Sequence, residues 1–170
     1  MFKKILPFIF FVSQFIYSQD NIPPEIFSEG NEVYCPLTEQ NIVTSFNIID
    51  PDDTTVTALY IQISEGYVQA EDLLILTGEN QGIQETWDAV TGKLELKGQA
   101  GGEVLYTDLI AAVYDVKFSS TNPAPANDKS FSFTIGDANY LDETEHYYVY
   151  FENENVLWTE AKELAENSTY

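Results

Sequence analysis

Arginine is absent from this chain of 170 residues, and lysine occurs only seven times, against 28 aspartates and glutamates. Two lysines lie near the start of the chain, whereas every acidic residue follows position 19. The chain from Asp20 onward therefore holds five lysines and 28 acidic residues, a formal charge of −23. Proteins that bind phosphate backbones or anionic lipid need clustered cations. We therefore exclude nucleic acid as a partner.

Long apolar runs are also scarce. Residues 5–16 form the longest one, behind Lys3 and Lys4. This run is too short to cross a hydrocarbon layer of about 30 Å as a helix. Together with the small Ser18 it predicts a signal peptide over residues 1–19, with an uncleaved anchor as the alternative. We expect a protein that is secreted or held at the outer cell surface, with no membrane span after the signal peptide.

Cysteine and histidine occur once each. Cys35 has no partner for a disulfide within the chain; we expect a buried free thiol, with a partner in a segment beyond this chain as the alternative. His146, the sole histidine, falls in a different predicted domain from Cys35, and no nucleophile–base motif surrounds either residue. We therefore expect no enzymatic activity.

Apolar and polar residues alternate in much of the remaining chain. The clear cases are TALYIQIS (57–64), GKLELKG (92–98), VYDVKFSS (113–120) and KSFSFTIG (129–136), and the weaker ones are SFNIID (45–50) and LLILTG (73–78). Such alternation is typical of strands with one buried face, and turn residues separate the runs. The pattern predicts an all-β fold, an antiparallel β-sandwich of immunoglobulin or cadherin type, over residues 31–136. A barrel is the alternative. We expect Trp87 in the sandwich core rather than exposed as a ligand platform.

Several of these motifs resemble the cadherin-like repeats of bacterial surface proteins. The resemblance rests on DPDD (50–53) before an alternating strand, on GKLELKG, and on the closing FSFTIG (131–136). Cadherin-type modules commonly bind calcium through clustered aspartates, so the resemblance implies Asp50, Asp52 and Asp53 as calcium ligands. The alternative is that DPDD is a turn in which the aspartates accept hydrogen bonds from nearby backbone amides.

The end of the chain has a different pattern. In HYYVYFENENVLWTEAKELAE (146–166), a tyrosine-rich strand precedes what we expect to be the first amphipathic helix of the sequence. This segment resembles the start of the C-type lectin-like fold: Trp158 and Ala161 match its W-x-x-A-x-x-x-C pattern, with Ala165 in the place of the cysteine. The resemblance implies an incomplete α+β domain over residues 137–170, whose calcium- and sugar-binding motifs would lie beyond Tyr170.

The predicted organisation is a signal peptide (1–19), a linker (20–30), a cadherin-like sandwich (31–136) and the truncated start of a lectin-like domain (137–170). This order resembles the N-terminal part of large adhesins and outer-surface proteins of Bacteroidetes-type bacteria. We expect a fragment of a longer chain that serves adhesion or recognition, stiffened by calcium and linked to carbohydrate binding in the full-length parent. Its expected partners are neighbouring domains, surface glycans or other cell-surface proteins. A purely structural spacer, or stalk, is the alternative function.

Overall fold

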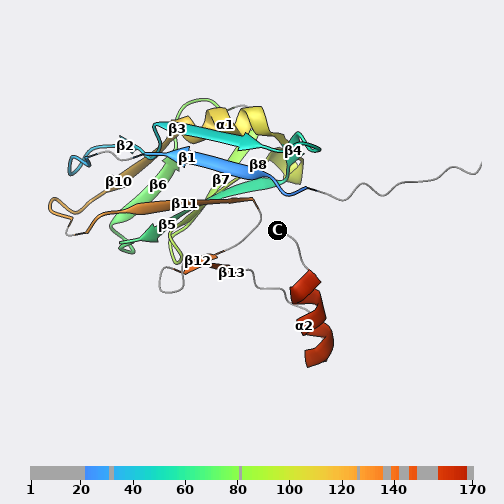
Figure 1. Cartoon of the computed structure of the whole chain (residues 1–170). Coiled ribbons are helices and arrows are strands. Elements are labelled where there is room, and N and C mark those ends of the chain that lie inside the picture. Colours follow the sequence, from blue (N-terminus) through green and yellow to red (C-terminus); the bar gives the residue numbers. More distant parts are fainter. Residues whose placement is uncertain are drawn as a thin grey trace, which may run out of the picture.

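A computed structural model describes residues 22–30, 33–80, 82–125, 127–135, 139–141, 146–148 and 157–167. Figure 1 shows the strands gathered in layers, with helix α1 lying along one side of them. The predicted signal peptide lies outside the described residues. Among the helices that are described, none is long and apolar enough to cross a membrane.

The strands form antiparallel sheets that pack as a sandwich. The largest sheet has the order β11-β5-β8-β7, formed by Ser130–Ile135, Ala58–Glu65, Lys93–Gly98 and Ile83–Asp88. A second sheet has the order β2-β10-β6, formed by Gln40–Asn41, Val116–Ser120 and Asp72–Leu76. β1 (Glu25–Glu29) pairs with β3 (Ser45–Ile49), and β4 (Thr55–Val56) pairs with β9 (Val104–Leu105). The predicted all-β, antiparallel β-sandwich is confirmed.

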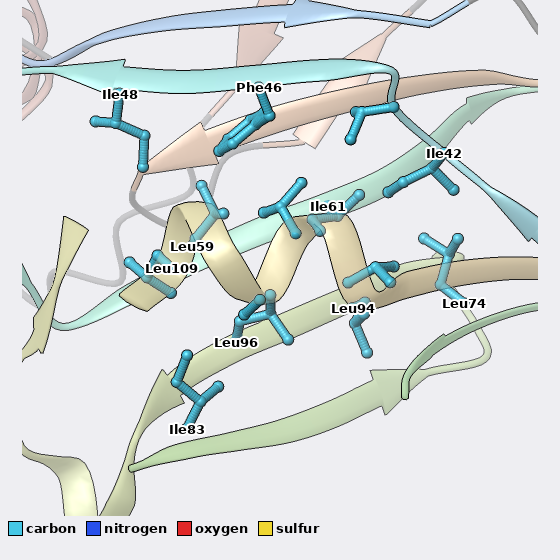
Figure 2. Close-up of a cluster of buried hydrophobic side chains, with 14 of the residues drawn as sticks. Ile42, Phe46, Ile48, Leu59, Ile61, Leu74, Ile83, Leu94, Leu96 and Leu109 are labelled. Atoms are coloured by element: carbon cyan, nitrogen blue, oxygen red, sulfur yellow. The ribbon is translucent and has the colours of Figure 1, made fainter. Parts of the chain in front are cut away.

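The core lies where the inward faces of the strands meet helix α1. Figure 2 shows the converging side chains of β3, β5, β6, β7, β8 and α1. The alternation predicted for β5 is confirmed, and β8 follows it at its leucines: the described core includes the fully buried Leu59, Ile61, Leu94 and Leu96. Burial of each such side chain stabilises the fold by about 1.5–3 kcal/mol. Lys93, which was expected on the outer face of β8, is also buried.

The alternation is weakest in β11. Its residues from Phe131 to Ile135 are half-buried on both faces, although the aromatic rings point to the core. The Phe133 ring lies 5.0 Å from that of Phe46 on β3, centroid to centroid. Among the residues that the structure describes, β11 pairs with β5 alone, so it is an edge strand of the largest sheet.

Part of one predicted strand is helical. The segment VYDVKFSS was expected to be extended throughout, but Tyr106–Asp115 form helix α1 and β10 begins only at Val116. A short 3₁₀ helix, Gln99–Gly101, precedes them. Leu109, Ala112 and Val113 are buried at the i, i+3 and i+4 spacing of a helix face, and Val116 continues the spacing. The expectation that the first amphipathic helix lies near the chain end was therefore wrong.

The sandwich also begins earlier than predicted. Residues 20–30 were expected to be a linker, but β1 lies within them and pairs residue by residue with β3, from Glu25 with Ile49 to Glu29 with Ser45. The side chain of Ile26 packs against the core. The sequence EIFSE gives no clear apolar alternation, because Ile26 is the one side chain of β1 that packs toward the described core.

Two short strands and a helix follow the sandwich. β12 (Asn139–Leu141) pairs with β13 (His146–Tyr148), and helix α2 spans Trp158–Asn167. The strand and the helix predicted for the tail are thus present. Their assignment to a lectin-like domain stays a prediction.

Candidate functional site: an acidic turn and a groove beside β11

The predicted calcium ligands lie in a tight turn between β3 and β4. Asp50 Oδ1 accepts hydrogen bonds from the backbone N–H groups of Asp52, at 3.1 Å, and Asp53, at 2.9 Å. An aspartate that binds its own backbone two and three residues further on is a common turn device. The chain therefore uses this carboxylate to shape the DPDD turn.

The second oxygen of Asp50 reaches helix α1. Asp50 Oδ2 accepts a hydrogen bond of 2.8 Å from the hydroxyl of Tyr106, the first residue of the helix. Desolvation acts to raise the pKa of Asp50, but the hydrogen bonds from Asp53, Tyr106 and Asp52 outweigh it and lower this pKa below 3.8. Burial, the hydrogen bond to Asp50 and the nearby carboxylates raise the pKa of Tyr106. The hydrogen bond from the Tyr106 phenol to the charged Asp50 carboxylate therefore links the turn to the start of α1.

The other two aspartates do not join Asp50 in a metal-binding group. Asp52 Oδ2 accepts a hydrogen bond of 3.1 Å from the backbone N–H of Ile22, and no described group of three or more acidic, cysteine or histidine side chains could hold a metal ion. Calcium prefers six to eight oxygen ligands. The geometry of the described residues is that of a turn, and calcium binding at Asp50, Asp52 and Asp53 stays a prediction.

Two further sequence expectations meet different outcomes. Cys35 was expected to be buried, but it is exposed, because it lies in a loop before β2. Trp87 on β7 is half-buried and packs against the core, with its ring centroid 6.1 Å from that of Tyr67 in an edge-to-face arrangement.

A groove that the sequence analysis did not predict lies beside β11. Its volume is about 720 Å³, within the usual range of binding pockets. It is lined by the end of β1, the segment around β2, part of β10 and the start of β11. Because these segments are distant in sequence, only the fold brings them together.

The floor of the groove is apolar, and most of its exposed lining residues are polar, with Val33 as an apolar exception. Buried Ile42, Val43 and Phe118 line it together with the half-buried Phe131, whose ring centroid lies 5.7 Å from that of Phe118. The rim residues include Glu29, Gln40, Asn127 and Asp128. Glu29 and Asp128 are exposed lining residues of the groove, and no described hydrogen bond or ion pair neutralises their carboxylates.

The cation nearest to this rim is neutralised inside the protein. Lys129 Nζ forms an ion pair of 2.6 Å with Asp72 Oδ2, and the two side chains are 9% and 1% exposed. Lys129 Nζ also donates to the carbonyl oxygen of Gly66, and Asp72 Oδ2 accepts from the backbone N–H of Val68. Desolvation of two such charges offsets much of their attraction, whereas removal of one partner would leave a buried charge unpaired. The pair holds the start of β11 against the start of β6.

A glycine permits the close approach at this corner. Gly66 has a φ of +70°, and a Cβ built on it would lie 2.2 Å from the carbonyl oxygen of Asp128. Any other residue would combine a strained backbone with a clash against the main chain. Gly66 thus positions the rim residue Asp128. In the sequence Gly66 indicates only a turn, and it gives no sign of the groove.

The strand order and the core define an all-β protein with an antiparallel sandwich and one packed helix. The chain is 31% identical over 130 residues to halomucin of Haloquadratum walsbyi, and the match covers 74% of this chain but only 1% of halomucin. No family model and no solved structure matches the chain. The chain thus spans about 1% of the length of the curated relative that it matches.

Proposed function

We propose that this chain is a non-enzymatic module of a secreted or cell-surface protein and serves adhesion or recognition. The observation that carries the proposal is the likeness to halomucin over 74% of the chain. Because the chain spans about 1% of that relative, a role as one module among many fits the likeness. The non-enzymatic character rests on the sequence, which lacks a nucleophile–base motif.

The charge distribution supports a module that works in contact with solvent and salt. Of the described lysines, Lys97 pairs with Glu95 at 2.7 Å, Lys129 pairs with Asp72, and Lys117 donates to Asn41. Because these cations are engaged within the protein, the 28 acidic residues dominate its outward field. Such a field keeps a protein soluble and repels anionic polymers.

A spacer is the second candidate function, favoured by the small share of halomucin that the module matches. A glycan array and a cell-adhesion assay with the full-length parent protein separate the two. Reproducible sugar or cell binding that this module is required for supports recognition. If neither sugar binding nor cell binding is detected, the result supports a spacer whose role is length and stiffness.

Calcium stiffening is part of the proposal and has its own test. If calcium binds only the folded chain with a Kd of about 10⁻⁴ M, about 10 mM calcium adds roughly 2.7 kcal/mol to the free energy of unfolding. The melting temperature is compared in calcium and in sodium at matched ionic strength, for the natural chain and for Asp52→Asn with Asp53→Asn. A calcium-specific rise that the double variant loses supports the site. Identical curves assign the aspartates to the turn alone.

A further inference from the structure

The two edges of the largest sheet are protected very differently. β7, at one edge, has the sequence IQETWD and carries Glu85 and Asp88. Glu85 Oε2 also accepts a hydrogen bond of 2.6 Å from the backbone N–H of Leu76 on β6, so a neighbouring strand partly covers this edge. Charges and covering elements are the usual means by which proteins prevent unwanted strand pairing.

In the part of the chain that the structure describes, β11 at the other edge has neither protection. Its sequence SFSFTI contains no charged residue and no proline. Within the described residues its backbone pairs with β5 alone, and β1 across the groove pairs with β3 alone. An uncharged edge strand with free backbone donors and acceptors is a template for an added strand.

The groove beside this edge has the composition that an added strand needs. Alternate side chains of such a strand would face the apolar floor at Ile42, Val43 and Phe131, and the others would face the rim. The rim presents the carboxylates of Glu29 and Asp128, while the ammonium of Lys129 is already paired with Asp72. Charge complementarity therefore favours lysine or arginine in the rim-facing positions.

We propose that the β11 edge and its groove bind an extended, basic segment of a partner protein by strand addition. Apolar side chains of the segment enter the groove, and its cations meet Glu29 and Asp128. A second copy of this chain fits poorly, because each copy carries a formal charge of −21. This proposal specifies the partner of the proposed recognition function.

The first test uses a short peptide of alternating valine and lysine, blocked at both ends, with a fluorescent label. Its binding to the full chain is measured by fluorescence anisotropy, against the same peptide with glutamate in place of lysine. We expect saturable binding of the lysine peptide and binding at least about tenfold weaker for the glutamate peptide. Equal affinities, or no binding of the lysine peptide, would overturn the proposal.

N-methylation separates strand pairing from simple charge attraction. Alternate residues of a strand direct their N–H groups to the same side. One peptide is therefore methylated at every valine nitrogen and another at every lysine nitrogen. We expect at least one of them to bind about tenfold more weakly than the parent peptide. If both keep the parent affinity, the backbone takes no part and strand addition is wrong.

A matched pair of variants locates the binding edge. Ser28→Lys places a cation at the exposed rim of the groove, and Thr86→Lys places the same charge on the exposed face of β7. We expect Ser28→Lys to weaken lysine-peptide binding severalfold more than Thr86→Lys, with melting temperatures alike. Equal effects would place the peptide elsewhere. Sedimentation that shows a dimer dissociated by Ser28→Lys would assign the edge to a second copy instead.

The outcome is separable from that of the proposed function. Absence of peptide binding together with sugar or cell binding by the parent protein would remove the groove assignment and leave recognition in place. Peptide binding with the expected edge and N-methyl dependence supports the groove whatever the glycan array shows.

Discussion

Helices α1 and α2 are both ten residues long, and they are held in place by different means. α1 buries Tyr106, Leu109, Ala112 and Val113 in the sandwich, and the N–H of its first residue donates to the carbonyl oxygen of Thr54, far away in sequence. In α2, Trp158 is 81% exposed, and the N–H of Leu157 donates to Glu160 within the same turn. α1 is therefore stabilised by tertiary packing and the start of α2 by local capping. An amphipathic stripe alone does not show that a helix has a surface to pack on.

The largest expected difference between the helices is at a buried leucine of α1. Leu109 is fully buried, so Leu109→Ala should lower the free energy of unfolding by about 2–5 kcal/mol through lost burial and the cavity left behind. Chemical denaturation monitored by tryptophan fluorescence measures the change. Thr107→Ala on the exposed face of α1 is the control and should change stability by less than about 0.5 kcal/mol. Equal losses at both positions would show that α1 packs in another orientation.

An intermediate effect is expected where α1 meets the acidic turn. Tyr106→Phe removes the hydroxyl that donates to Asp50 and leaves the ring in place, so the melting temperature should fall by a few degrees. Tyr60→Phe on β5 removes a hydroxyl that donates to Glu95 at 3.2 Å, so it measures the cost of losing a comparable hydrogen bond away from the turn. An unchanged melting temperature for Tyr106→Phe would mean that the turn and α1 are not coupled.

Acid should weaken the stabilisation that the hydrogen bond between Tyr106 and Asp50 provides. Because the pKa of Asp50 is lowered by folding, its contribution to stability is fully present above its ordinary pKa of 3.8 and is lost as the pH falls through the lower, folded value. The difference in melting temperature between the natural chain and Tyr106→Phe should therefore shrink below about pH 4. A difference that stays constant from neutral to strongly acidic pH would contradict the assignment.

The smallest effect is expected in α2. Trp158 is largely exposed, so Trp158→Ala should change the free energy of unfolding of the sandwich by less than about 0.5 kcal/mol. Denaturation followed by far-ultraviolet circular dichroism measures it without relying on the lost indole. A loss comparable to that of Leu109→Ala would mean that α2 has a packing partner that shields this residue, and the contrast between the helices would disappear.

The sequence predicted the strands with one buried face better than it predicted helix α1 or the edge strand β1. β5 and β8 were predicted because burial on one face imposes strict alternation, as at Leu94 and Leu96. α1 was missed because Tyr114, Val116 and Phe118 alternate with Asp115 and Lys117 as in a strand, at the point where the helix ends and β10 begins. The buried set from Leu109 to Val116 has helical spacing, a signal that was present and not used. β1 was missed because an exposed edge strand has little alternation to detect.

The candidate sites divide in the same way. A turn was one of the two structures that the DPDD motif predicted. The hydrogen bonds that form it join residues two and three positions apart, so a short motif can indicate them. Its link to Tyr106 spans 56 positions and could not be read from the motif. Neither the exposure of Cys35 nor the groove beside β11 follows from a local pattern, because both depend on which distant segments cover a surface.

The sequence by itself determined the all-β class, most strand positions, the strongly acidic charge and the amphipathic stripe of α2. These features depend on side-chain order over a few residues or on composition, and physical chemistry acts on them locally. Only the tertiary structure decided that α1 is a packed helix, that β7 and β11 are the outer strands of the largest described sheet, and that Lys129 is neutralised by Asp72. The reason is that burial, pairing and effective charge depend on neighbours that the chain supplies from far away in its sequence.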